Sequence, residues 1–168
     1  MSAAAALDRA SDAEALEALS RCCGASRWAS AMAARRPFGS DDALLRAADE
    51  EWAAMRRDDV LEALSHHPRI GANLDELRKK YASTAGWAAS EQAGAAAASE
   101  DTLRALRDGN VRYEAKFGHI FVVCATGKTA AEMLAVLEAR LGNDHATELA
   151  VAKAEQAKIT KIRLEKLA

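Results

Sequence analysis

Apolar residues recur at helical spacing along most of this chain, and polar capping residues divide the pattern into segments. The pattern predicts helices over residues 11–22, 26–35, 40–52, 58–67, 101–117, 133–141 and 144–167. Ser11, Ser40 and Thr129 each precede a segment and can accept a hydrogen bond from its first turn. The sequence therefore predicts an all-α fold, a single compact multi-helix domain over residues 1–168 with one short extended segment near 119–125.

That extended segment, His-Ile-Phe-Val-Val-Cys-Ala, has the strand-like composition that the rest of the chain lacks. An unpaired extended segment leaves backbone N–H and C=O groups unsatisfied, and a bound ligand is one way to satisfy them. In the last predicted helix, Ala152, Ile159 and Leu167 fall on one stripe, with Arg163 between the last two. A guanidinium there needs a carboxylate, carbonyl oxygens or a ligand, unless it snorkels at the edge of the core.

The composition is typical of a helical protein, and it also limits the kinds of partner that we expect. Half of the 168 residues are apolar, with many alanines and only 5% aromatics. Basic and acidic residues number 23 and 25, a net charge of −2 without a basic field, which argues against a nucleic-acid partner. The three cysteines form no CxxC pair, which argues against a zinc site or a disulfide framework. No signal peptide or membrane-length apolar run is visible, so we expect a cytoplasmic protein without a membrane partner.

Two polar positions stand out as candidates for chemistry. Pro68 should end the preceding helix at His67, which leaves an imidazole near a helix C-terminus. Such a histidine can be poised to deliver a proton, or can be a partly exposed cap. Glu91 lies in a stretch of small residues and is either drawn inward or caps a helix behind Ser90. The run Thr-Gly-Lys-Thr at 126–129 is not a phosphate loop, because position 122 is valine where that motif needs glycine.

Together these stretches resemble a known family, the OHCU decarboxylases, which act on 2-oxo-4-hydroxy-4-carboxy-5-ureidoimidazoline in purine catabolism. The likeness runs from about Leu7 to Leu167. It rests on the order and spacing of six motifs: His-Pro-Arg-Ile-Gly at 67–71, Glu-Gln-Ala-Gly at 91–94, Tyr-Glu-Ala-Lys-Phe-Gly-His-Ile-Phe-Val at 113–122, Ala-Thr-Gly-Lys at 125–128, Arg-Leu-Gly-Asn-Asp at 140–144, and Glu-Gln-Ala-Lys-Ile at 155–159 with Arg-Leu at 163–164.

The resemblance implies an all-α homodimer that works without a metal or an organic cofactor and releases carbon dioxide to give S-allantoin. It places the catalytic residues at His67, Glu91 and Arg163. The substrate contacts that it implies are Pro68, Ala88, Ser90, Gln92, Phe121, Val122, Val123, Cys124 and Ala125. Relatives commonly have serine where this chain has Ala88, so one hydroxyl contact is either missing or supplied by Ser90.

The implied chemistry suits these residue types. Decarboxylation leaves an electron pair on carbon, and the substrate's own ring can delocalise it, so the protein need only bind, orient and protonate. We expect His67 to donate the proton and Glu91 to hold the imidazole or a substrate group. Arg163 would grip a carboxylate or carbonyl oxygens, while Gln92 and the backbone of 121–125 would bind the ureido and ring amides.

Two alternatives remain open from the residues. One is a non-catalytic helical interaction module, with Arg163 and Glu91 as a buried ion pair and His67 as a helix cap. The other is a hydrolase of 5-hydroxyisourate, but the strand-rich domain that such an enzyme would need is not visible in this sequence.

Overall fold

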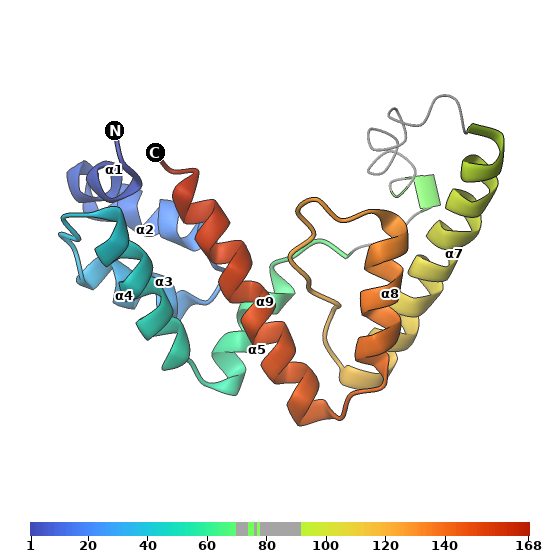
Figure 1. Cartoon of the computed structure of the whole chain (residues 1–168). Helices are drawn as coiled ribbons and strands as arrows, with labels where there is room; N and C mark the ends of the chain where they lie inside the picture. Colours follow the sequence, from blue (N-terminus) through green and yellow to red (C-terminus); the bar gives the residue numbers. More distant parts are fainter. Residues whose placement is uncertain (70–73, 76, 78–91) are drawn as a thin grey trace. The chain divides into compact units, whose positions relative to one another are not determined.

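The structure is a computed structural model that describes residues 1–69, 74, 75, 77 and 92–168, with the side chains of 92–99 left aside. The chain forms two compact units (Figure 1). Unit 1 comprises Met1–His67 and Val151–Ala168, and unit 2 comprises Pro68–Ala150. No helix in the described part of the chain is long and apolar enough to cross a membrane.

Helices make up both units, and no strand is present among the described residues, so the prediction of an all-α fold is confirmed. Unit 1 contains α1 (Ala3–Arg9), α2 (Asp12–Cys22), α3 (Ser26–Ala34), α4 (Asp41–Ala53), α5 (Arg57–Ser65) and the last part of α9 (His145–Glu165). Unit 2 contains α7 (Gln92–Phe117), α8 (Ala130–Leu141) and the first turns of α9.

The helix starts predicted at Ser11, Ser40 and Thr129 are confirmed by their caps, whereas the start predicted near residue 101 is wrong because α7 begins at Gln92. Ser11 and Glu14 form a reciprocal capping box, while the side chains of Ser40 and Thr129 each accept a backbone N–H three residues later. α1, whose N-cap is Ser2, is not among the predicted helices. The predicted end of α5 at His67 is too late, because the helix ends at Ser65 and His66 is its C-cap.

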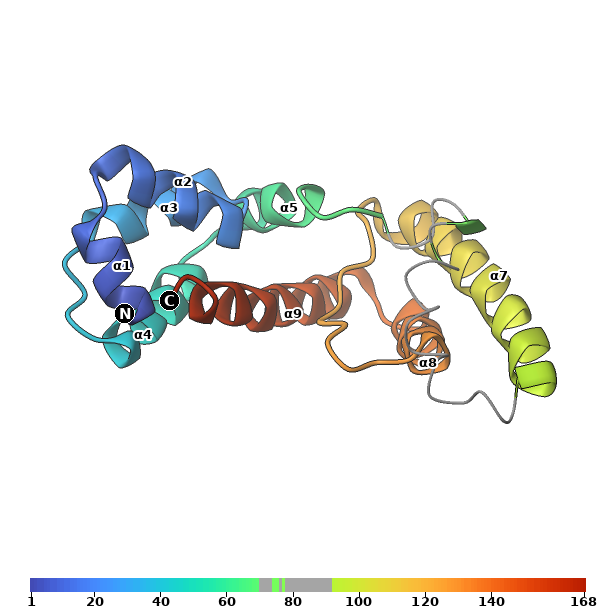
Figure 2. The same ribbon diagram turned by 90° about the horizontal axis from the view of Figure 1, so that it is seen from above.

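Each unit has its own hydrophobic core. Unit 1 has a core of fully buried side chains from α2, α3, α4, α5 and α9, of which the largest are Trp28, Leu19, Met32, Leu44, Leu64 and Leu164. In unit 2, α7 and α8 lie side by side in both views (Figure 2). Their shared core includes Leu106, Tyr113, Phe117, Met133 and Leu137.

The predicted apolar stripe of α9 is confirmed at Ala152 but is wrong by about one residue further along the helix. Ile159, Arg163 and Leu167 are only half-buried, whereas Ala152, Gln156, Thr160 and Leu164 are buried. These positions are four residues apart and therefore share one face. Polar residues occupy two of them because they hydrogen bond to each other, with Gln156 Nε2 donating to Thr160 Oγ1 at 3.0 Å.

The segment predicted to be extended, residues 119–125, is neither helix nor strand and follows Gly118 directly. Gly118 has φ of 76° and donates its N–H to the carbonyl of Glu114, which ends α7 in the way that favours glycine. Phe121, Val122 and Val123 are buried, so the segment contributes to the core of unit 2.

The turn between α2 and α3 touches the end of α5 through Gly24. A Cβ at this glycine would lie 2.6–2.7 Å from Cβ, Cγ and Cδ2 of His66, which is closer than non-bonded carbons approach. The clash involves Cβ of His66, so a change of rotamer alone cannot relieve it. Glycine at position 24 therefore lets the end of α5, and with it His67, pack against α2.

We expect Gly24→Ala to lower the free energy of unfolding by about 1–3 kcal/mol, as overpacking a well-packed site does. The measurement is urea unfolding followed by circular dichroism. The matched control is Gly142→Ala, where the new Cβ meets nothing closer than the Ala139 carbonyl at 3.5 Å and φ is −79°. Equal stability of the two variants would contradict the packing argument.

Candidate active site

His67 lies just beyond the C-cap of α5, and its N–H donates to the carbonyl of Leu64 at 3.2 Å. Its ring is half-buried, and Nε2 lies 2.5 Å from Oε1 of Gln156 on α9. Burial lowers the pKa of His67, and the nearby charges of Arg163 and His66 lower it further, while the hydrogen bond to Gln156 opposes them. A pKa below the ordinary value of 6.5 leaves the imidazole neutral at neutral pH.

Arg163 is half-buried on α9 and binds the end of α2. Its Nη1 donates to the backbone carbonyls of Arg21 and Cys22, each at 3.4 Å. Of the three kinds of partner expected for this guanidinium, the carbonyl oxygens are therefore present within unit 1. The guanidinium is also close enough to His67 for its charge to lower the pKa of the imidazole.

The two adjacent cysteines lie beside this pair and are buried. Burial raises the pKa of Cys22 to about 11 and also raises that of Cys23, although Arg163 opposes the shift at both. Both groups are therefore thiols at neutral pH, and neither has the thiolate character of a reactive cysteine. They form no disulfide with each other or with Cys124.

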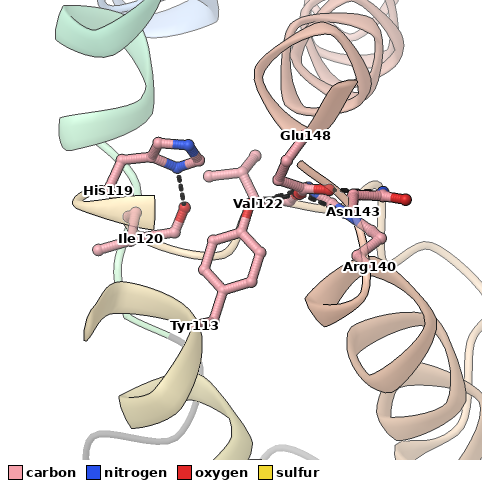
Figure 3. Close-up of polar contacts among 7 residues, drawn as sticks. All are labelled: Tyr113, His119, Ile120, Val122, Arg140, Asn143 and Glu148. Atoms are coloured by element: carbon pink, nitrogen blue, oxygen red, sulfur yellow. Dashed lines mark hydrogen bonds and ion pairs between the residues drawn. The ribbon is translucent and has the colours of Figure 1, made fainter. Parts of the chain in front are cut away.

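In unit 2, a buried arginine holds the backbone of the segment predicted to contact substrate. Arg140 Nη1 donates to the carbonyl of Val122 at 2.7 Å (Figure 3). The same guanidinium pairs with Glu148 through Nε at 2.7 Å and Nη2 at 2.5 Å, and stands 4.6 Å from the centre of the Phe121 ring. The position of this backbone is thus coupled to an ion pair between α8 and α9.

The carboxylate of Glu148 is fully buried and every oxygen has a donor. Tyr113 and Arg140 donate to Oε1, and Asn143 Nδ2 donates to Oε2 at 3.0 Å (Figure 3). Burial and the bond to Glu148 raise the pKa of Tyr113, so its hydroxyl stays protonated and remains a donor. A buried charge with three donors is a stable arrangement, whereas the same charge without its arginine is not.

The other predicted site residues are divided between the units and the undescribed stretch. Pro68 is exposed and begins unit 2, which also holds residues 121–125 and Gln92, the first residue of α7. The side chain of Gln92 is not described, and Glu91, Ala88 and Ser90 lie outside the described residues. The structure thus brings two of the three predicted catalytic side chains, those of His67 and Arg163, together in unit 1.

Sequence reasoning missed the polar residues that support these groups, namely Gln156, Thr160, Arg140 and Glu148. Arg140 and Gln156 lie in the motifs that carry the family resemblance, and these motifs were the available signal for the two residues. The resemblance itself implied no role for either of them. Within the described part of the chain, no group of three His, Cys, Asp or Glu side chains gathers as a metal site would require.

Comparison with known proteins places the chain in a family. The family model described as OHCU decarboxylase matches residues 8–165, nearly the whole chain. The chain belongs to the OHCU decarboxylase family. The resemblance seen in the sequence motifs is therefore confirmed.

Curated relatives carry names from urate degradation. The chain is 40% identical over 153 residues to "Uric acid degradation bifunctional protein TTL" of Arabidopsis thaliana, covering 87% of this chain and 45% of the relative. It is 28% identical over 134 residues to "Uric acid degradation bifunctional protein" of Bacillus sp. (strain TB-90), covering 79% of this chain and 25% of the relative. The chain thus spans less than half the length of these two proteins.

Two solved structures share the fold. A crystal structure of OHCU decarboxylase in the presence of (S)-allantoin is 34% identical, with a TM-score of 0.72 over 94% of this chain and 98% of that one. A crystal structure of (S)-allantoin synthase is 19% identical, with a TM-score of 0.71 over 99% of this chain and 54% of that one. The second match supports the fold alone.

We expect Arg140→Met to destabilise the protein by about 3–5 kcal/mol, because the substitution leaves the buried Glu148 carboxylate without its cation. Urea unfolding monitored by circular dichroism would measure the loss. The control is Arg35→Met, which removes an arginine paired with Glu50 and Glu51 at the surface and should leave the midpoint nearly unchanged. Similar losses in both variants would contradict a special contribution from the buried pair.

Proposed function

We propose that this chain is a decarboxylase that converts 2-oxo-4-hydroxy-4-carboxy-5-ureidoimidazoline to S-allantoin and carbon dioxide. The observation that carries the proposal is the match, over 94% of this chain and 98% of the other, to the crystal structure of an OHCU decarboxylase in the presence of (S)-allantoin. Membership of the family over residues 8–165 supports it independently.

The substrate sets what the protein must do. Its ring carbon 4 carries both the carboxylate and a hydroxyl group, and carbon 5 carries the ureido group. When the bond to the carboxylate breaks, carbon dioxide leaves and the electron pair passes into the ring, where a ring nitrogen takes up a proton. The hydroxyl proton must then leave oxygen and a proton must reach carbon 5, which becomes the stereocentre of allantoin.

We assign that proton transfer to His67. A neutral imidazole can accept the hydroxyl proton and donate a proton to carbon 5, and the lowered pKa of His67 keeps it neutral at the start. Because the imidazole approaches from one face of the ring, the product would be a single enantiomer. The net reaction consumes one proton and releases one molecule of carbon dioxide, and the ring itself accepts the electrons without a metal or an organic cofactor.

The remaining roles follow the residue types. Arg163 would bind the carboxylate or ring carbonyl oxygens with guanidinium N–H groups other than those of Nη1, which donates to the carbonyls at the end of α2. Glu91 would orient the imidazole or a substrate hydroxyl, and Gln92 would bind the ureido group. Substrate contacts from the backbone of residues 121–125 and from Pro68, Ala88 and Ser90 are also part of this proposal. As part of the same proposal, the protein is a cytoplasmic homodimer.

The proposed activity predicts enantiopure allantoin from freshly oxidised urate. Circular dichroism of the product mixture should show S-allantoin with this protein and a racemate without it, because the uncatalysed decay has no chiral proton donor. His67→Asn should slow turnover by about 10²–10⁴, the usual contribution of a positioned acid–base group, while melting at nearly the same temperature. A racemic product in the presence of the folded wild type would overturn the proposal.

The state of His67 predicts a pH dependence of kcat/KM. The imidazole must be neutral to accept the hydroxyl proton, so activity should fall as pH decreases through the pKa of His67. Since burial lowers this pKa from its ordinary value of 6.5, the acidic limb should lie below pH 6.5. If the acidic fall in kcat/KM were instead centred above pH 6.5, it would contradict the neutral resting state assigned to His67. The measurement is the initial rate of S-allantoin formation against pH, corrected for spontaneous decay.

A further inference from the structure

The proposed reaction gives Gln156 no role, yet its side chain is fully buried on the inner face of α9. A buried amide is stable only when both of its ends are hydrogen bonded. Both ends are occupied here. The amide nitrogen donates to Thr160 Oγ1 at 3.0 Å, and the amide oxygen lies 2.5 Å from Nε2 of His67.

Thr160 accepts a hydrogen bond from the amide nitrogen, which supports this direction of the amide. It lies one turn further along α9, is buried, and also hydrogen bonds to the thiol of Cys23 at the end of α2. With its nitrogen engaged by the hydroxyl of Thr160, Gln156 turns its oxygen toward the imidazole. A carbonyl oxygen only accepts hydrogen bonds, so the ring nitrogen opposite it must carry a hydrogen.

A neutral imidazole has one N–H group, and the contact with Gln156 puts it on Nε2. Nδ1 then carries the lone pair. We propose that Gln156 is a positioning residue that holds His67 as the Nε2–H tautomer and so makes Nδ1 the atom that exchanges protons with the substrate. The catalytic part of this inference rests on the proposed function, whereas the tautomer itself does not.

The bond also acts on the charged state of the ring. Arg163 on α9 and His66 at the end of α5 are the charged or titratable groups of unit 1 that oppose protonation of His67, together with burial. The hydrogen bond that His67 donates to Gln156 works in the opposite direction, because an imidazolium Nε2–H is a stronger donor than the neutral group. Gln156 would therefore let a buried imidazole hold a proton briefly during its transfer from oxygen to carbon.

The tautomer can be observed without any substrate. Nitrogen-15 NMR of the full-length wild type with labelled histidine should show Nε2 of His67 as the protonated nitrogen and Nδ1 as the bare one at neutral pH. A spectrum assigned to His67 with the proton on Nδ1 would overturn the inference, even in an active enzyme. His67→Asn identifies the signal by its disappearance.

Two substitutions at one position test the catalytic part. Gln156→Met keeps the size of the side chain but removes the hydrogen bond, so kcat should fall about 10–100-fold with little change in KM, and the acidic limb should move to lower pH. Gln156→Glu places a carboxylate against the ring, so the limb should move to higher pH. A side chain needed only for packing would not move the limb in opposite directions.

The control is Asn110→Leu, which removes another buried helical amide, one that donates to the carbonyl of Leu106 at 2.8 Å in unit 2. It should leave the pH profile in place, whatever its effect on stability. Unshifted profiles in both Gln156 variants would overturn the positioning role. If the wild type shows the Nε2–H tautomer but forms no S-allantoin, the proposed function fails and the assignment of the tautomer stands.

Discussion

The rule that buried polar groups must be hydrogen bonded governs α9 more than any apolar contact does. Its buried positions include Glu148, Gln156 and Thr160, each of which would cost stability if its partners were absent. Glu148 is satisfied by donors from α7, α8 and the turn after α8, and Gln156 by the end of α5 and its own helix. Within each unit, therefore, the neighbouring segments are held to α9 by specific hydrogen bonds as well as by packing.

This rule explains which part of the fold could be predicted. Helix starts at Ser11, Ser40 and Thr129 depend on local hydrogen bonds, which the sequence displays directly. The buried face of α9 depends on partners far away in the chain, so a search for apolar spacing selected Ile159 and Leu167 instead of Gln156 and Thr160. α1 was missed for a related reason, since a run of alanines has no polar face to mark its orientation.

The candidate site, like the fold, could be predicted from the sequence only in part. Motif order identified the family and pointed to His67 and Arg163, but not to the environment that decides their chemistry. A helix C-terminus favours the imidazolium, whereas burial and the charge of Arg163 lower the pKa of His67, and these two influences come from parts of the fold that the local sequence does not display. Spacing likewise left the partner of Arg163 open, because the carbonyls at the end of α2 are 141 and 142 residues away in the chain.

In the proposed reaction, the neutral state of His67 agrees with a mechanism that needs no strong acid. After carbon dioxide leaves, the intermediate is an enol whose own hydroxyl group holds a proton for carbon 5, so the protein need only move that proton. A side chain that accepts a proton and then donates it works best when neither its neutral nor its protonated state is strongly favoured. Burial and Arg163 favour the neutral state, and the bond to Gln156 favours the protonated one, so the balance between them sets how readily the ring takes up a proton and releases it.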